Sequence, residues 1–432
     1  MNEITLSQRV QRVKPSPTLA VTARAAELRA AGKDIIGLGA GEPDFDTPDH
    51  IKEAAILAIR NGATRYTAVD GTPELKSAII NKFQRDNGLS YQPDQILVSC
   101  GGKQSFYNLA QALLNPGDEV IIPAPYWVSY PDMVKLADGE PVFIKAGLEQ
   151  TFKITPEQLD AAITPKTRLF VINSPSNPTG ITYSREELKG LADVLLRHPH
   201  VLIATDDMYE HIIWGKEPFA NIVNVCEELF PRSIVLNGVS KAYAMTGWRI
   251  GYAGGPRTLI QAMKKVQSQS TSNPASISQA AAQAALDGDQ SCIAPMLKAF
   301  KERHDYVVET LNRMDGVHCL PSDGTFYSFP DVRGVIERSC GVSNDTELAE
   351  MLPADELLLP KLLEMDGDEI TVDLERCEVR AGDETWPFEI DGFARHCLLN
   401  GMDRLDFLLA DLPPDPAEHS MKHGLGQAAG IR

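Results

Sequence analysis

The chain has 432 residues, of which 43% are hydrophobic and 23% are charged, and its formal net charge is −18. This length exceeds what one hydrophobic core can support and predicts two or three globular domains. The negative charge argues against nucleic acid or an anionic membrane as a partner. Neither an N-terminal signal peptide nor an apolar run of about 18 residues is present, so we expect a cytoplasmic location. Seven scattered cysteines without a CxxC pair indicate reduced thiols and no metal site.

The N-terminal residues predict an arm followed by one helix. The helix opens at residues 16–18, continues through an alanine-rich run to Ala31 and ends at Gly32. A short strand at 35–38 then leads into GAGEPDF, which contains Gly41. Most Gly/Pro clusters are simple turns, but a backbone without Cβ also lets a small substrate approach closely.

The next elements predict an anion-binding turn. Tyr66 precedes a helix at about 73–87, and a strand at 96–98 leads through Gly101, Gly102 and Lys103 into a helix that reaches Leu114. Free backbone amides and the helix dipole converge where a glycine-rich turn enters a helix. Many α/β turns look the same, and on pattern alone Tyr66 is a packing residue and Lys103 a solvated lysine.

Three further strands are each followed by polar or aromatic candidates. The strand at 120–122 precedes PAPYWVSY with Trp127, and the strand at 170–172 precedes SPSNPTG with Asn177. The strand at 201–204 ends at TDDMYE, which contains Asp206 and Tyr209. Taken singly, these residues are typical of a core tryptophan, a turn and a capped helix. Because strands alternate with helices and candidates follow strand ends, the pattern predicts a doubly wound parallel sheet with ligands at the strands' carboxyl ends.

A strand at 234–236 leads into GVSKAYAMTGWRIG, which spans residues 238–251. Lys241 lies among small and apolar residues there, so its ammonium would be partly desolvated and its pKa lowered. A neutral amine is suited to Schiff-base chemistry, and Arg249 could hold a phosphate through a bidentate contact. The alternative is a solvated surface lysine.

This stretch resembles the lysine signature of class I aminotransferases, the pyridoxal-phosphate enzymes of the aspartate aminotransferase type. The resemblance implies fold type I, a mostly parallel seven-stranded sheet, and pyridoxal 5'-phosphate as cofactor. It assigns Lys241 to the Schiff base and to proton transfer, Asp206 to the ring nitrogen, and Tyr209 with Asn177 to the phenolic oxygen. Trp127 would stack on the ring. The remaining cofactor residues that it implies are Gly101, Gly102, Lys103, Ser240, Arg249 and, from the neighbouring subunit of a homodimer, Tyr66.

The resemblance also implies the substrates. Gly41, Lys103, Trp127 and Asn177 would contact an amino acid and a 2-oxo acid, with GGKQ and PYWVSYP indicating a dicarboxylic or prephenate-like partner. Asp207 stands where the family has glutamate, and we interpret it as a neighbour without a role. Farther on, a helical tract is expected from Gly255 to about Met314 with a break at 270–274, and a strand at Gly324–Phe329 resembles one that begins the family's small domain.

The family pattern stops near residue 350. From 351 to the end the chain has 18 acidic and 7 basic residues, and the strand with the arginine that binds the substrate's α-carboxylate is missing. Residues 352–410, with FEIDGFARHCLLNGMD, instead resemble the small subunit of 3-isopropylmalate dehydratase. His396 and Cys397 could suggest a catalytic or metal pair, but adjacent residues diverge on a helix, and a buried capping helix is the favoured interpretation.

The sequence therefore predicts a chimera with five parts. They are an N-terminal arm with part of the small domain (1–45), a large cofactor-binding domain (46–290), a truncated small domain (291–350), the dehydratase-like fragment (351–411) and a disordered tail (412–432). We expect transamination to be impaired or absent without the carboxylate-binding arginine, for which Arg380 is a poor substitute. The alternatives are a catalytically dead cofactor-binding chain and a C-terminal interaction module for the dehydratase large subunit.

Overall fold

The computed structural model describes residues 4–348, apart from 16, 31, 33–36, 38, 40, 216, 339–341 and 346, and three short strands between 370 and 387. The chain divides into two compact units, Met1–Arg313 with His318–Asp331, and Met314–Val317 with Val332–Arg432. The domain boundaries that the sequence suggested stay predictions. Among the described residues, no helix combines the length and the apolar character that crossing a membrane requires.

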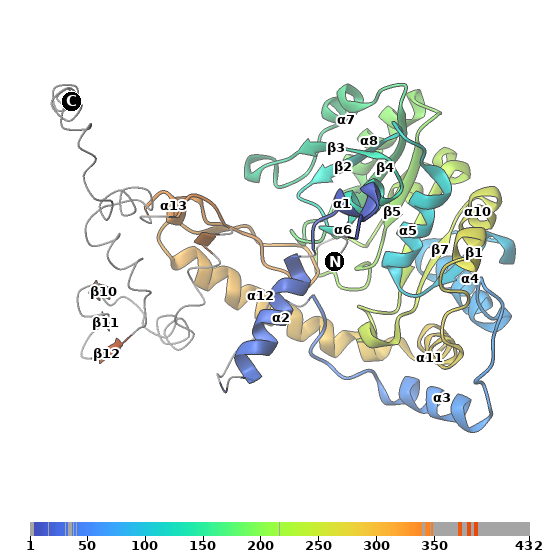
Figure 1. Cartoon of the computed structure of the whole chain (residues 1–432), viewed down its shortest axis with the longest axis horizontal. Helices are drawn as coiled ribbons and strands as arrows, with labels where there is room; N and C mark the ends of the chain where they lie inside the picture. The colour runs from blue at the N-terminus through green and yellow to red at the C-terminus, as the bar shows by residue number, and fades with distance from the viewer. Residues whose placement is uncertain are drawn as a thin grey trace. The chain divides into compact units, whose positions relative to one another are not determined.

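A seven-stranded sheet forms the centre of the first unit, in the order β1-β7-β6-β5-β4-β2-β3 (Figure 1). Five strands run parallel to their neighbours, whereas β7 is antiparallel to both β1 and β6. The predicted mostly parallel seven-stranded sheet is confirmed. Its strands are β1 (Ile96–Ser99), β2 (Glu119–Ala124), β3 (Glu140–Lys145), β4 (Thr167–Asn173), β5 (Leu202–Asp206), β6 (Ser233–Gly238) and β7 (Gly251–Gly254).

Alternating side chains of these strands feed two hydrophobic cores, one on each face of the sheet. Leu97, Val171 and Leu236 belong to the core that contains residues of α5, α6 and α10. Val98, Ile172 and Val235 belong to the core that contains residues of α3, α4, α8 and α11. Strand residues that are buried on both faces are typical of a parallel sheet covered by helices on both sides.

The helices around the sheet begin and end at recognisable signals. For example, α4 follows Thr72, whose hydroxyl accepts a hydrogen bond from the Leu75 amide at 3.3 Å, and it ends at Gly88 with a φ of 66°. The helices of four turns or fewer are α1 (Gln8–Gln11), α2 (Pro17–Ala30), α3 (Asp49–Arg60), α5 (Gly102–Leu113), α6 (Ser129–Leu136), α7 (Pro156–Ala162), α8 (Arg185–Arg197), α9 (Ile222–Val225), α10 (Arg257–Ser268), α11 (Ser276–Asp287) and α13 (Arg333–Ile336). The longer ones are α4 (Pro73–Asn87) and α12 (Ile293–Arg313).

Several local predictions can be compared with these elements. The helix before Gly32 is confirmed as α2, and the break at 270–274 separates α10 from α11. A second break at 288–292, before α12, was missed. The strand expected at 35–38 lies largely outside the described residues. The four cysteines that the structure describes are free thiols, at 100, 226, 292 and 319.

The strand expected at Gly324–Phe329 is wrong. Only Gly324 forms a β-bridge, with Ile213, and Thr325 has a φ of 69°, which a continuous strand does not tolerate. The two-stranded sheet nearby is formed by β8 (His318–Cys319) and β9 (Pro330–Asp331).

In the second unit, β10 (Ile370–Asp373), β11 (Glu378–Ala381) and β12 (Glu384–Pro387) form an antiparallel sheet. Arg380 lies in β11, opposite Thr371 and Thr385, in the strand-like setting that the sequence predicted. His396, Cys397 and the predicted tail at 412–432 lie outside the described residues.

Candidate functional site

The candidate residues follow the ends of strands that lie side by side in the sheet. Asn177 follows β4, Asp206 ends β5 and Lys241 follows β6. The parallel register pairs Asn173 with Asp206 and Asp206 with Leu236, so these three strands end at the same edge. Contacts join most of the predicted site residues there.

Lys241 contacts a main-chain carbonyl and two aromatic rings at this edge of the sheet. Its ammonium donates to the carbonyl of Gly41 and lies 5.5 Å from the ring centroid of Phe326 and 6.0 Å from that of Tyr209. Burial lowers the pKa of Lys241 to about 8, with Arg249 adding to this effect and acidic neighbours opposing it. A substantial fraction of the amine is therefore neutral near physiological pH, which nucleophilic attack on an aldehyde requires.

Asp206 is supported by Tyr130, which the sequence reasoning did not assign to the site. The buried hydroxyl of Tyr130 donates to Asp206 Oδ2 at 2.5 Å, and the Met208 amide donates to Oδ1 at 3.3 Å. Burial raises the pKa of Asp206, whereas these two hydrogen bonds and the charge of Lys241 favour its ionised form. A protonated ring nitrogen would supply a further positive partner for this carboxylate.

Tyr209 and Asn177 meet through a second missed residue, Tyr327. The hydroxyls of Tyr209 and Tyr327 lie 2.8 Å apart, and the side-chain amide of Asn177 donates to Tyr327 Oη at 3.3 Å. The Asn177 backbone amide donates to Asn173 Oδ1 at 2.7 Å, which fixes the turn after β4. Three polar groups thus converge where a phenolic oxygen could accept hydrogen bonds.

A cradle of main chain and one guanidinium lies after β1. Gly101 has a φ of 91° and precedes α5, which begins at Gly102. A Cβ at Gly101 would collide with the Arg249 guanidinium, and a Cβ at Gly251 would collide with the backbone of Gly101 and Gly102. Arg249 donates to the Thr246 carbonyl at 2.9 Å and also to the Cys100 carbonyl. A helix N-terminus beside a guanidinium fits a phosphate.

The remaining predicted residues differ in how closely they join the site. Trp127 packs edge-on against Tyr130, with ring centroids 5.2 Å apart, and the Lys103 ammonium lies 5.2 Å from the Trp127 ring centroid. Ser240 is buried directly before Lys241. Tyr66 is 92% exposed, so it makes little contact within its own chain.

These side chains fit the cofactor that the sequence resemblance implies. The donor set contains a partly neutral amine, a carboxylate for a ring nitrogen, hydroxyl and amide groups for a phenolic oxygen, and a cradle for a phosphate. Gly41 is also close: a Cβ there would collide with the Tyr327 hydroxyl. The buried carboxylate of Asp207 accepts from Thr205 Oγ1 at 2.6 Å and from Asn221 Nδ2 at 2.7 Å, which gives this residue a structural place beside the site.

Comparisons with known proteins agree with this arrangement. Residues 33–364 match the family model described as Aminotransferase class I and II. Residues 359–392 match a second model, LeuD, described as LeuD_N. The two matches overlap at 359–364 and do not meet at the junction that the sequence suggested near 351.

Individual relatives cover most of the chain. It is 66% identical over 333 residues to the aspartate/prephenate aminotransferase of Nitrosomonas europaea, a match that spans 77% of this chain and 84% of that protein. It is 57% identical to the enzyme of the same name from Cereibacter sphaeroides, over 84% of this chain and 89% of that one. The solved aspartate aminotransferase of Rhizobium meliloti superposes with a TM-score of 0.78 and 50% identity, covering 82% of this chain and 89% of that one. The Thermus thermophilus aspartate aminotransferase with maleate gives a TM-score of 0.75 and 42% identity, covering 84% and 98%.

Proposed function

Because the chain belongs to the class I and II aminotransferases, enzymes that use pyridoxal 5'-phosphate, we propose that it transfers an amino group between an amino acid and a 2-oxo acid. The names of its relatives and the motifs around Lys103 and Trp127 support aspartate, glutamate or a prephenate-like compound as the amino-group partner. The proposal is carried by the setting of Lys241. Burial lowers the pKa of its amine to about 8, and its charge interacts with that of Asp206.

The cofactor supplies an aldehyde that links to amines and a ring that withdraws electrons from the substrate's α-carbon. Lys241 anchors the cofactor and then takes the proton from that α-carbon. Asp206 keeps the ring nitrogen protonated, while Tyr209 and Asn177 donate to the phenolic oxygen. Trp127 stacks on the ring and, with Gly41, Lys103 and Asn177, contacts the substrate. The phosphate is held by Gly101, Gly102, Lys103, Ser240 and Arg249.

We propose that the enzyme is a homodimer in which Tyr66 reaches the phosphate of the neighbouring site. Its 92% exposure supports this, because it leaves the side chain accessible to a second subunit. A cytoplasmic location stays a prediction.

Turnover is expected to be impaired. The sequence lacks the family's arginine that binds the substrate's α-carboxylate, and losing one partner of a buried, hydrogen-bonded ion pair costs about 2–5 kcal/mol. This corresponds to a loss of roughly 30-fold to several thousandfold in kcat/KM. In the limiting case the chain binds cofactor without turning over.

A single-turnover experiment with glutamate tests the proposal. Wild-type protein loaded with cofactor should convert it slowly to the pyridoxamine form, and Lys241→Ala should abolish the conversion. A visible cofactor band that persists unchanged in Lys241→Ala would refute the assignment of the lysine. Cofactor binding without any conversion would identify the chain as catalytically dead.

The match to LeuD_N favours a second candidate function for the C-terminal part. There, residues 351–411 would act as a fragment of the 3-isopropylmalate dehydratase small subunit that binds the large subunit. Size-exclusion chromatography of the full chain with that subunit tests this function, and we expect no complex because the fragment is only part of a small subunit. An intact-mass measurement tests whether the two parts form one polypeptide.

A further inference from the structure

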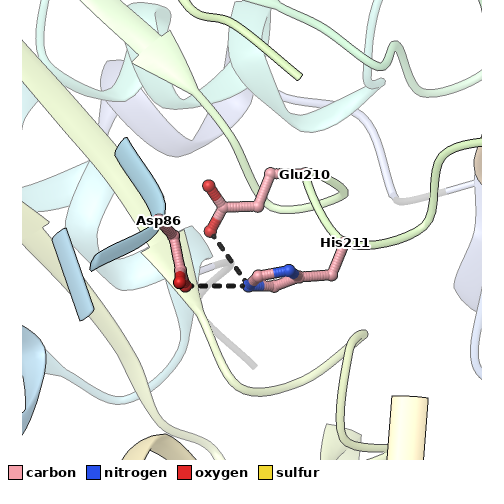
Figure 2. Close-up of side chains that lie close together, drawn as sticks. All are labelled: Asp86, Glu210 and His211. Atoms are coloured by element: carbon pink, nitrogen blue, oxygen red, sulfur yellow. Dashed lines mark ion pairs between the residues drawn. The ribbon is translucent and has the colours of Figure 1, made fainter. Parts of the chain in front are cut away.

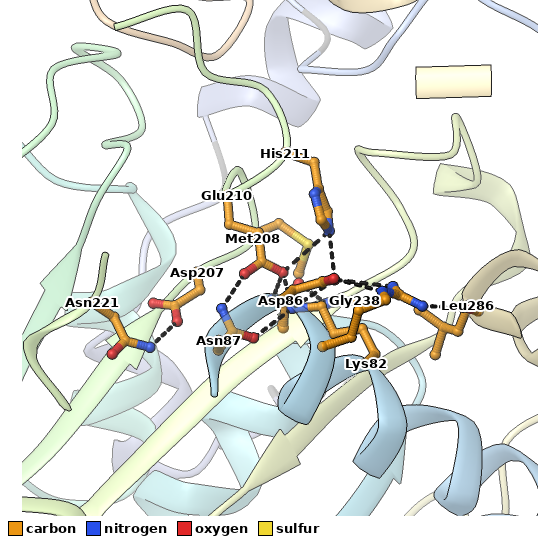
Figure 3. Close-up of polar contacts among 12 residues, drawn as sticks. Lys82, Asp86, Asn87, Asp207, Met208, Glu210, His211, Asn221, Gly238 and Leu286 are labelled. Atoms are coloured by element: carbon orange, nitrogen blue, oxygen red, sulfur yellow. Dashed lines mark hydrogen bonds and ion pairs between the residues drawn. The ribbon is translucent and has the colours of Figure 1, made fainter. Parts of the chain in front are cut away.

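The segment that carries Asp206 and Tyr209 has a second, buried face. Asp206 and Tyr209 contact residues of the candidate site, whereas Glu210 lies among buried polar side chains from other elements (Figure 3). We call this set the buried ionic cluster; its members are Lys82, Asp86, Asn87, Glu210, His211 and Asn237. The reaction as proposed above uses none of these side chains.

Glu210 is the member with the most partners. Its Oε1 accepts from the Lys82 ammonium and from Asn237 Nδ2 at 2.7 Å, and its Oε2 accepts from Asn87 Nδ2 at 2.6 Å. The side chains of Lys82 and Glu210 are 1% and 3% exposed. Burial alone would raise the pKa of Glu210, but Lys82 and the other donors outweigh burial and lower it. The carboxylate is therefore ionised and rigidly held.

The same carboxylate ties together the two segments that bear Tyr209 and Lys241. Glu210 directly follows Tyr209. Asn237, on β6, donates to Glu210 and also accepts from the Gly238 amide at 2.7 Å, three residues before Lys241. A displacement of Glu210 would consequently change the position of Tyr209 relative to Lys241.

Asp207 fixes the same segment through a second set of hydrogen bonds. It accepts from the side-chain amide of Asn221, which is the N-cap residue of α9, and Asn224 in that helix donates to the Asn87 carbonyl at 2.7 Å. Asn87 in turn donates to Glu210. The buried side of the segment is thus fixed at two points, at residues 207 and 210.

A metal ion is the competing explanation for part of this cluster. His211 Nε2 lies 3.3 Å from Asp86 Oδ2 and 3.5 Å from Glu210 Oε1, and the three groups could meet at one ion (Figure 2). However, the Lys82 ammonium already donates to the same Glu210 oxygen and lies 3.8 Å from Asp86 Oδ2. Since a cation placed there would meet that ammonium, Lys82 supplies the positive charge.

We propose that Glu210 is a positioning residue for the reaction, which holds Tyr209 and Lys241 in register from beneath the site through Lys82, Asn87 and Asn237. This inference rests on the roles proposed for Tyr209 and Lys241. Tyr209 donates a hydrogen bond to the phenolic oxygen of the cofactor, and such a bond favours the ionised oxygen and weakens proton binding at the linkage to Lys241. If Tyr209 is displaced, the proton at this linkage should be bound more tightly, so the pH at which the visible cofactor band changes should rise.

The test compares Glu210→Gln with Asp70→Asn in holoenzyme. Asp70 is a matched control, because it is also a buried carboxylate paired with a lysine of α4, Lys76, at 2.7 Å. Both variants should unfold at lower temperature than wild type. Only Glu210→Gln should raise the pH midpoint of the band, by about half a unit or more, equivalent to a roughly threefold change in proton affinity.

A second variant covers the case in which Glu210→Gln does not fold. Asn237→Ala leaves the Lys82–Glu210 pair intact and removes the link from Glu210 to β6 together with the acceptor of the Gly238 amide. It should raise the midpoint in the same direction. Midpoints of both variants equal to that of Asp70→Asn would overturn the proposal. If the wild type shows no band that depends on Lys241, the proposed function itself fails, which is a distinguishable result.

Discussion

Removing the hydroxyl of Tyr130 should destabilise the cofactor-free protein in a pH-dependent way. The hydroxyl donates to Asp206 Oδ2 at 2.5 Å, and a hydrogen bond to an ionised group contributes about 1.5–3 kcal/mol. In Tyr130→Phe the ring contacts with Phe106 and Trp127 remain, so the lost bond dominates the effect. Because this hydrogen bond lowers the pKa of Asp206, its loss should raise that pKa further.

The sign of the pH dependence follows from the pKa of Asp206, which burial already raises in the folded state. When folding raises the pKa of a carboxyl, the free energy of unfolding falls as the pH rises from the unfolded pKa, near 4, to the folded pKa. Tyr130→Phe extends this window upward. The variant should therefore lose about 1.5–3 kcal/mol at about pH 7.5 and clearly less at about pH 4, where more of the folded carboxyl is protonated.

Urea unfolding of cofactor-free protein at the two pH values measures this difference. Tyr183→Phe is the matched control, because the buried Tyr183 hydroxyl accepts from the Ile154 amide at 2.9 Å, so the bond that is lost is to a neutral main-chain group. Its loss of stability should be the same at both pH values. An equal loss for Tyr130→Phe at both pH values would refute the argument that Tyr130 stabilises the charge of Asp206.

Three further outcomes are expected. The rate at which cofactor-free protein captures pyridoxal 5'-phosphate, followed by stopped-flow absorbance, should rise with pH and level off above about pH 8, because the neutral amine of Lys241 is the nucleophile. A rate that continues to rise up to about pH 10.5 would contradict the lowered pKa of Lys241. Gly101→Ala places a Cβ against Arg249 at a φ of 91° and should weaken cofactor binding by about 1–3 kcal/mol in a fluorescence titration, whereas Gly247→Ala, where a Cβ meets nothing, should not. Arg232→Met removes hydrogen bonds to three carbonyls at and beyond the C-terminal end of α8 and should lower the free energy of unfolding by about 2–4 kcal/mol with unchanged cofactor affinity.

Much of the site could be predicted because its signals are local. Lys241 and Asp206 each follow a short apolar strand, and parallel strands that end at one edge bring such residues together. Tyr130 carried a weaker signal: it lies three residues after Trp127, at the start of α6, and only the tertiary structure shows that it reaches Asp206.

Tyr327 could not be predicted, because its position depends on a backbone turn. The residues around it are rich in aromatic side chains, which favour a strand, yet Thr325 adopts a positive φ and its amide donates to the Ile212 carbonyl at 2.8 Å. The tertiary contact outweighs the local β-propensity and turns the chain so that the Tyr327 hydroxyl meets Tyr209. The hydrogen bond from Asn221 to Asp207 could not be predicted either, because it joins residues outside one local element.

The meeting of Gly251 with Gly101 and Gly102 has a consequence for how this enzyme can change. Three backbones touch there without any side chain between them, so the shape of the phosphate cradle does not depend on rotamers or on neighbouring substitutions. A mutational scan should therefore find Gly101 and Gly251 intolerant of replacement, including by alanine. Drift in substrate preference must come from side chains elsewhere in the site.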